Sequence, residues 1–195
     1  MKDMFKLGSV LALYATVACV GLAWVYVLTT PIIAQRQQTD LENSLKELFP
    51  EADSFNSEEL IVMPNPQVSL RSMYSATKNG TVIGLALRAS GSSYGGPIVV
   101  LVGISTQATV SRVKILEHSD TPGLGANAAS SKYYIDKPTK TTFSGQFSGK
   151  SVQDPFTVHE DIVAITASTI TSRAVTSIVK TCGEAAISWF SEHTL

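Results

Sequence analysis

The sequence predicts an α+β protein, in which a single N-terminal transmembrane helix precedes one mixed α+β domain. Three observations support this fold class. Residues 7–35 contain no charged side chain, strand-like runs separated by Gly and Pro turns occupy the middle of the chain, and an amphipathic helical pattern closes it. Strands that precede a terminal helix are typical of α+β domains. Residues 36–195 are enough for one domain with a hydrophobic core.

The composition excludes several classes of protein. The chain has 195 residues, of which 44 % are hydrophobic and 16 % charged, and its net charge is −1. Soluble domains usually contain about 25 % charged residues, so the low value reflects the apolar N-terminal segment. The near-neutral charge excludes a broad basic surface for nucleic acid. Composition also excludes collagen-like, disulfide-scaffold and fully disordered chains.

The N-terminal segment is expected to be an uncleaved membrane anchor. Residues 7–30 form an apolar stretch, and about 20 such residues span a bilayer. A cleaved signal peptide is the alternative, but its apolar region has only about 7–15 residues. Trp24 and Tyr26 suit the headgroup region, and Pro31 is expected to end or kink the helix.

The charges that flank this segment leave its orientation open. Lys2 and Lys6 precede it, and Arg36 and Lys46 follow it. Cytoplasmic flanks carry an excess of Lys and Arg. The two sides carry equal numbers of these basic side chains, and the N-terminal amine slightly favours a cytoplasmic N-terminus.

The first half of the remaining chain is expected to begin with a stalk helix. Residues 39–49 carry leucines at helical spacing before Pro50, and they continue from the membrane helix. Residues 51–67 are acidic and contain two prolines, which predicts a loop with one short strand. Residues 70–90 form strand-like runs on both sides of Lys78-Asn79-Gly80, which is a good hairpin signal.

The second half is expected to alternate strands and loops before a long helix. Strands are predicted at residues 98–104, 108–117 and 162–165, and Gly-rich loops at residues 91–97 and 119–129. A helix is predicted over residues 172–193. Its apolar face is expected to comprise Val175, Ile178, Val179, Cys182, Ala186, Ile187 and Phe190.

Neither the cysteines nor the histidines form a recognisable metal or redox motif. Cys19 lies in the apolar segment and Cys182 in the terminal helix, so both are expected to be unpaired apolar residues. The sequence has no Cys-x-x-Cys pattern, and its histidines at positions 118, 159 and 193 are scattered. It therefore gives no support for a zinc or iron–sulfur site. A Gly-x-Ser-x-Gly nucleophile motif is also absent.

Hydroxyl side chains cluster at the turn before the terminal helix. In the run AITASTITS they belong to Thr166, Ser168, Thr169, Thr171 and Ser172. Free backbone N–H groups and the helix dipole suit such a turn to a phosphate group. Ordinary helix capping by one Ser or Thr is the alternative, and the residues alone favour it.

A second candidate is the loop Thr121-Pro122-Gly123-Leu124-Gly125. Its glycines permit positive φ and a close approach of the backbone to a ligand. It lacks the ending of a P-loop and is too short for a dinucleotide fingerprint, so an ordinary tight turn is the alternative. Tyr94, which precedes two glycines, is a candidate stacking residue with a packing role as its alternative.

The order of these features resembles a known family. The apolar anchor is followed by YGGPIVVLVGIS, then by VKILEHSDTPGLG, and then by ITASTITSRAV before the terminal helix. This arrangement resembles the FMN-binding G subunits of Rnf ion-translocating ferredoxin:NAD oxidoreductases, the RnfG family, and their relative NqrC. The resemblance covers essentially the whole chain, whose short length is more similar to RnfG than to NqrC.

The resemblance implies a covalently bound FMN. In this family a flavin transferase joins FMN through its phosphate to a threonine, as a phosphoester. The family pattern is Asp-x-x-Ser/Thr-Gly-Ala-Thr, and its final threonine aligns with Thr169. By the same resemblance, the expected FMN-binding residues are Thr169, Thr166, Ser168, Thr171, Ser172, Thr121, Pro122, Gly123, Leu124, Gly125 and Tyr94. No catalytic residue and no metal ligand is expected.

The chain departs from the family pattern at a few positions. Val163 stands where the pattern has Asp, Ala167 where it has Gly, and Ser168 where it has Ala. Asp120 stands where the family usually has Glu before Thr-Pro-Gly-Leu-Gly. The acceptor hydroxyl is retained. A structural or assembly subunit that has lost its flavin is one alternative, and a membrane-tethered binding module with the same fold is another.

The resemblance also implies a role and a location. The chain is expected to be an electron-transfer subunit, not catalytic alone, that relays electrons between neighbouring subunits of a membrane complex that moves Na⁺ or H⁺. The expected location is the inner membrane, with a cytoplasmic N-terminus and the FMN-binding domain on the periplasmic side. Its expected partners are the other subunits, the flavin transferase and lipid, and no nucleic acid. The expected organisation is an anchor at residues 1–35, a stalk helix and linker at 36–67, and an FMN-binding domain at 68–195.

Overall fold

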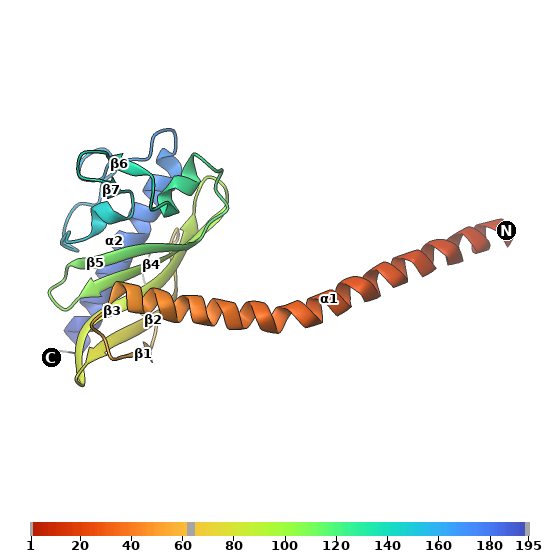
Figure 1. The fold of residues 1–195 in the computed structure, drawn as a ribbon, viewed down its shortest axis with the longest axis horizontal. Helices are drawn as coiled ribbons and strands as arrows, with labels where there is room; N and C mark the ends of the chain where they lie inside the picture. The colour runs from red at the N-terminus through yellow and green to blue at the C-terminus, as the bar shows by residue number, and fades with distance from the viewer. Residues whose placement is uncertain (1, 62–64, 194–195) are drawn as a thin grey trace. The chain divides into compact units, whose positions relative to one another are not determined.

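The computed structural model describes residues 2–61 and 65–193. Contacts divide the chain into two compact units, Met1–Asn43 and Ser44–Leu195. The described part of the first unit is helical, and the second unit contains the sheet and the terminal helix (Figure 1). A long N-terminal helix followed by an antiparallel sheet and a C-terminal helix confirms the predicted α+β class.

The N-terminal helix is longer than the apolar segment. α1 runs over Lys2–Leu48, so the stalk helix continues from the apolar helix as predicted. Pro31 lies inside α1 rather than at its end, so it does not end the helix. Within the described residues, α1 is the one helix that is long and apolar enough to cross a membrane.

Five antiparallel strands form one sheet in the order β1-β2-β3-β4-β5 (Figure 1). The strands are β1 (Ser54–Glu58), β2 (Ser69–Lys78), β3 (Thr81–Ser92), β4 (Pro97–Ser105) and β5 (Val110–Glu117). They confirm the strands predicted between residues 51 and 117. Each strand pairs with its neighbour in the sequence, so the sheet is a simple meander.

The turn between β2 and β3 has the backbone that the sequence predicts. Asn79 and Gly80 have φ values of 50° and 79°, so both central residues are left-handed. A two-residue turn of this kind matches the twist of the strands it connects, and Asn-Gly is the preferred pair for it. Lys78 pairs with Thr81 across the turn.

The terminal helix α2 (Thr169–Glu192) packs against β3 and β4 and closes the core. It begins at Thr169, three residues before the predicted start. The members of its predicted apolar face that are buried are Val175, Ile178, Val179, Cys182 and Ala186, and Phe190 is partly buried against the core. The prediction is wrong for Ile187, which is 39 % exposed, because the buried face of the last turns runs through Ala185, Ala186 and Trp189 instead.

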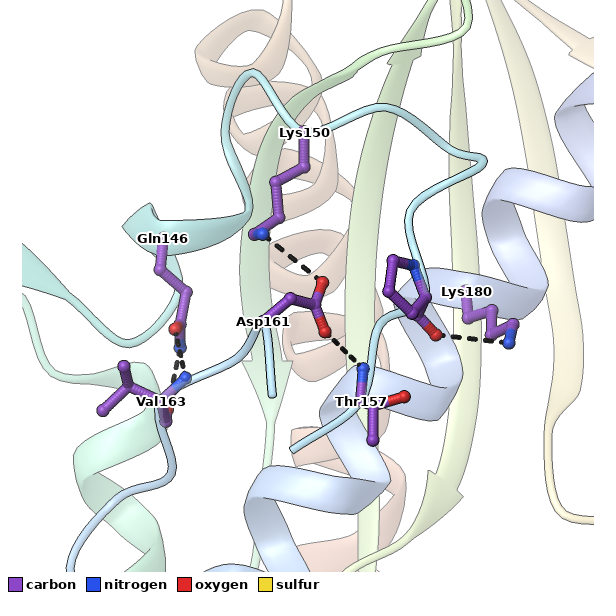
Figure 2. A network of polar contacts seen from close by, with 7 residues as sticks. Gln146, Lys150, Thr157, Asp161, Val163 and Lys180 are labelled. Atoms are coloured by element: carbon purple, nitrogen blue, oxygen red, sulfur yellow. Dashed lines mark hydrogen bonds and ion pairs between the residues drawn. The ribbon is translucent and has the colours of Figure 1, made fainter. Parts of the chain in front are cut away.

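The strand expected at residues 162–165 is not formed. Ile162 and Ile165 are buried in the core, which accounts for the apolar pattern. Between them, the N–H of Val163 donates to Gln146 Oε1 at 2.8 Å, and its carbonyl accepts from Gln146 Nε2 at 3.1 Å (Figure 2). The Gln146 side chain thus satisfies the backbone groups that a neighbouring strand would otherwise pair with.

Short elements fill the rest of the connection between β5 and α2. They are η1 (Gly125–Ala129), β6 (Tyr134–Asp136), β7 (Thr141–Thr142) and η2 (Gly145–Phe147). Phe143 and Phe147 are fully buried and meet edge to face, with ring centroids 5.6 Å apart. These aromatic rings anchor the connection between β5 and α2 in the core.

The second compact unit includes the end of α1. Leu45, Leu48 and Phe49 are buried. Gly84 on β3 and Gly103 on β4 leave room for them, since a Cβ on Gly84 would lie 2.6 Å from the Phe49 ring and one on Gly103 would lie 3.2 Å from Leu48. The compact unit therefore includes residues 44–67 as well as the sheet strands that follow.

Cys182 is a buried apolar residue, as predicted. Its side chain is fully buried in the core, and this burial raises the pKa of its thiol. A thiol that is shielded and protonated is a poor nucleophile and a poor metal ligand. Among the described residues, no group of His, Cys, Asp and Glu side chains is arranged to hold a metal ion.

Candidate functional site

One cavity of about 480 Å³ brings together three segments that are distant in the sequence. These segments are the loop between β3 and β4, the loop after β5, and the turn that begins α2. The lining residues are Tyr94, Asp120, Thr121, Leu124, Gly125, Ala167, Ser168, Thr169, Ile170 and Thr171. The volume lies within the range of about 300–1,000 Å³ that is usual for small-molecule sites.

Most of the predicted site residues line this cavity, and a few do not. Those that line it are Tyr94, Thr121, Leu124, Gly125, Ser168, Thr169 and Thr171. Those outside the lining are Pro122, Gly123, Thr166 and Ser172. The lining also contains Asp120, Ala167 and Ile170, which the prediction did not include. Asp120 could have been found from its place next to the Thr-Pro-Gly loop, whereas no local pattern marks Ile170.

The N-terminus of α2 has no side-chain cap. Ser168 occupies the N-cap position, but its hydroxyl makes no capping hydrogen bond. The first bond of the helix runs from Ser172 N to Ser168 O at 3.0 Å, so the N–H groups of Thr169, Ile170 and Thr171 precede the helical ladder. These donors and the helix dipole make the start of α2 suitable for a phosphate group.

Ser172 is a structural residue. Its fully buried hydroxyl accepts from Ile165 N at 3.0 Å and donates to Ser168 O at 3.0 Å. The hydroxyl therefore joins the first turn of α2 to the segment that precedes it. The sequence pattern groups Ser172 with the candidate ligand-binding hydroxyls because hydrogen bonds across a turn cannot be recognised from the sequence.

The hydroxyl of Thr169 is the one best placed for attachment of a ligand. Thr169 is half-buried, lines the cavity and is the first residue of α2. Its hydroxyl has no hydrogen-bond partner in the described part of the chain. Thr166 is exposed and lies outside the cavity lining, while Thr171 is fully buried.

Asp120 joins two of the three segments. Its Oδ1 accepts from Gly95 N at 2.7 Å, and the residue is only 6 % exposed. The backbones are close at this point, since a Cβ on Gly95 would lie 2.7 Å from Asp120 Cα. Asp120 Oδ2 and Thr171 Oγ1 are buried and have no partner among the described residues. The cavity thus has free amide donors, a free hydroxyl and two unpartnered oxygens, which fits a phosphorylated ligand that carries further hydroxyl groups.

Two family models match separate parts of the chain, and curated proteins match most of its length. A model of the FMN-binding domain matches residues 93–184, and one of the RnfG N-terminal region matches residues 1–48. The chain is 32 % identical to the G subunit of the proton-translocating ferredoxin:NAD(+) oxidoreductase complex of Clostridium ljungdahlii, over 92 % of this chain and 89 % of that protein. The chain belongs to the RnfG family.

Two other relatives support the same assignment. Identity is 31 % to the G subunit of the Na(+)-translocating ferredoxin:NAD(+) oxidoreductase complex of Acetobacterium woodii, over 90 % of this chain and 88 % of that protein. The chain is 33 % identical to the G subunit of an ion-translocating oxidoreductase complex of Aliivibrio fischeri, over 92 % of this chain and 89 % of that protein. The chain is therefore the RnfG component of such a membrane complex, and every residue that lines the cavity lies in its FMN-binding domain.

The structure shows the surroundings of two residues, Ala167 and Val163, that depart from the RnfG pattern. Ala167 has a φ of 60°, which is a left-handed conformation that favours glycine. Val163 is 56 % exposed and lies outside the cavity lining, and its backbone is held by Gln146 whatever its side chain. Neither substitution removes a group that lines the cavity.

The acidic residue near Val163 has a structural role. Asp161 Oδ1 accepts from Thr157 N at 2.6 Å, and its Oδ2 lies 3.4 Å from Lys150 Nζ (Figure 2). Partial burial opposes ionisation, but the hydrogen bond from Thr157 and the Lys150 ammonium outweigh it and lower the pKa of Asp161 below its usual value. Asp161 fixes the segment that leads to α2 and does not line the cavity.

Proposed function

We propose that this RnfG-family chain is an electron carrier whose FMN is joined through its phosphate to Thr169 Oγ1. The observation that carries the proposal is the position of that hydroxyl, which has no hydrogen-bond partner among the described residues, lines the cavity and stands at the uncapped start of α2. The phosphoester keeps a negative charge, which the N–H groups of Thr169, Ile170 and Thr171 stabilise.

Other residues of the cavity suit the rest of the cofactor. Tyr94 and Leu124 are 76 % and 43 % exposed, so they offer apolar surface to a flavin ring. The flavin supplies the electron-transfer chemistry when it is bound, and the protein supplies attachment, orientation and the polarity of the surroundings. A covalent link prevents loss of the cofactor.

The complex gives this carrier its partners. We expect electrons to enter and leave through neighbouring subunits of the membrane complex. We expect a flavin transferase to transfer FMN from an activated flavin nucleotide, so that the bond from the FMN phosphorus to the leaving nucleotide breaks as the bond to Thr169 Oγ1 forms and the hydroxyl proton is released. The proposed orientation has the N-terminus in the cytoplasm and the cavity on the periplasmic side of the inner membrane. Residues 7–35 carry no charge, so the span itself is unsuited to ion transport.

Substitution of the acceptor tests the proposal. The wild-type chain and the Thr169→Val variant are purified with the complex after expression with the flavin transferase. We expect fluorescence of the wild-type band to survive denaturing electrophoresis and the adduct to map to Thr169 by peptide mass. The Thr169→Val variant should lose this fluorescence completely, because valine has no hydroxyl to esterify. Thr166→Val is the matched control and should remain fluorescent.

Two outcomes would contradict the proposal. A wild-type band without fluorescence from flavin-replete cells would favour a structural subunit that has lost its flavin. An adduct on Thr166 or Thr171 would preserve the electron-carrier function and overturn the assignment of the acceptor to Thr169.

A further inference from the structure

Two buried oxygens of the cavity wall, Asp120 Oδ2 and Thr171 Oγ1, have no hydrogen-bond partner among the described residues. They flank the same point, because a Cβ on Gly125 would lie 2.6 Å from Asp120 Cγ and 2.7 Å from Thr171 Oγ1. Buried polar side-chain atoms nearly always have partners in folded proteins. An unpartnered carboxylate oxygen beside an unpartnered hydroxyl in a cavity wall therefore points to a ligand.

We propose that Asp120 and Thr171 hold the ribityl hydroxyl groups of the flavin, which makes them positioning residues of the cofactor. The inference rests on the proposed attachment of FMN at Thr169. A sugar-type hydroxyl both donates and accepts hydrogen bonds. Asp120 Oδ2 accepts, and the Thr171 hydroxyl donates, so together they satisfy both capacities of one such group.

The position of Thr171 selects the ribityl chain rather than the flavin ring. Thr171 lies two residues after Thr169 in the first turn of α2. The phosphate is attached at Thr169, and the ribityl chain is the part of FMN that follows the phosphate. The ring lies beyond that chain, where the exposed side chains of Tyr94 and Leu124 offer apolar surface.

The backbone fixes the orientation of the Asp120 carboxylate. Oδ1 is held by Gly95 N at 2.7 Å, which leaves Oδ2 as the free acceptor. Both unpartnered oxygens are shielded from solvent, so a ligand hydroxyl reaches them only after a small movement of the loop at residues 121–125. Gly125 has no side chain, so its backbone packs directly against Asp120 and Thr171, and a Cβ at this position would clash with both residues.

Binding of FMN without the covalent link tests the inference. The full chain is made without the flavin transferase, kept in detergent and titrated with FMN. The Asp120→Asn and Thr171→Val variants each keep the size of the side chain and should bind FMN about tenfold or more weakly, as expected for loss of a hydrogen bond. Asp154→Asn, which makes the same chemical change outside the cavity lining, should bind like the wild type.

Two further readouts separate cofactor contact from a structural role. Without FMN, both variants should melt no lower than the wild type, because neither removes a hydrogen bond from the ligand-free cavity wall. The absorption maximum of bound FMN should stay unchanged, because the ribityl hydroxyls are not conjugated with the ring. A lower melting temperature in both variants, or a shifted maximum, would overturn the assignment to the ribityl chain.

The inference and the proposed function fail in different ways. Wild-type affinity in both variants, together with a covalent adduct on Thr169, would contradict only the inference. Absence of an adduct on Thr169 in the wild-type complex would contradict the proposed function on which the inference rests.

Discussion

Ala167 carries a side chain in a backbone conformation that favours glycine. Its φ of 60° places the Cβ close to the following carbonyl, which costs about 1–2 kcal/mol for an L-residue. The residue lies in the cavity lining, directly before the N-cap Ser168 of α2. This left-handed turn is a physical reason for the glycine in the RnfG pattern, and alanine makes the same turn at an energetic cost.

Replacement of Ala167 by glycine should therefore stabilise the protein. We expect Ala167→Gly to raise the free energy of unfolding by about 0.5–1 kcal/mol, since the relief of strain exceeds the added entropy of the unfolded chain. The measurement is the midpoint of chemical denaturation. Ala174→Gly, in the interior of α2, is the matched control and should lower the free energy of unfolding by about 1 kcal/mol. Equal destabilisation by both variants would refute the strain at position 167.

The five hydroxyls around the start of α2 illustrate what a sequence leaves undecided at the scale of residues. Their side chains look equivalent along the chain. In the structure Ser172 bonds to Ile165 and Ser168, Thr171 is fully buried, and Thr169 is half-buried at the cavity. The family resemblance singled out Thr169 as the acceptor, and the geometry supplies a physical reason for that proposal.

At the scale of elements, hydrogen bonds hold the segment that precedes α2. Lys180 Nζ, on α2, donates to Pro155 O at 3.3 Å, and Asp161 accepts from Thr157 N within the same segment (Figure 2). These contacts hold the loop that leads into residues 162–165, where the apolar pattern predicted a strand. Hydrogen bonds between side chains and the backbone can replace the backbone hydrogen bonds of a strand pair without changing the local sequence pattern.

The lowered pKa of Asp161 predicts a pH dependence of stability. The carboxylate is favoured in the folded state, so it stabilises the protein above the unfolded pKa of about 3.9, and this contribution falls as pH drops through the lowered pKa. We expect Asp161→Asn to lower the free energy of unfolding by about 1–2 kcal/mol at pH 7. The difference should shrink at acidic pH, as measured by urea denaturation between pH 7 and pH 3. Glu160→Gln, at an exposed neighbour, is the control. A difference that stays constant over this range would contradict the role of the charge.

At the scale of the whole molecule, the second compact unit has its own core. Leu45 and Leu48 at the end of α1, and Phe49 directly after it, are also buried in this unit, and the sheet includes β1. The FMN-binding domain expected at residues 68–195 omits both of these parts. Leu45, Leu48 and Phe49 therefore add buried apolar surface to a unit that the sequence divided into a linker and a domain.

Truncation tests how much of the chain the unit needs. A chain that begins at Ser44 should be soluble without detergent and should unfold cooperatively, because it retains the whole sheet and its buried residues. A chain that begins at Val68 should be less stable by several kcal/mol, since burial of each lost Leu or Phe contributes about 1.5–3 kcal/mol. Thermal and urea denaturation of the two chains provide the comparison. Equal stability would show that residues 44–67 are only a linker.

Elements with local sequence signals were predictable without the fold. The uncharged run predicted the apolar helix, Asn79-Gly80 predicted the hairpin, and helical spacing predicted most of the buried face of α2. Tertiary structure alone decided how Tyr94, the loop after β5 and the start of α2 form one cavity. It also decided that Asp120 Oδ2 and Thr171 Oγ1 are buried without partners among the described residues. The physical reason is that periodicity and turn preference act within a few residues, whereas burial and hydrogen bonding join segments that only the folded chain brings together.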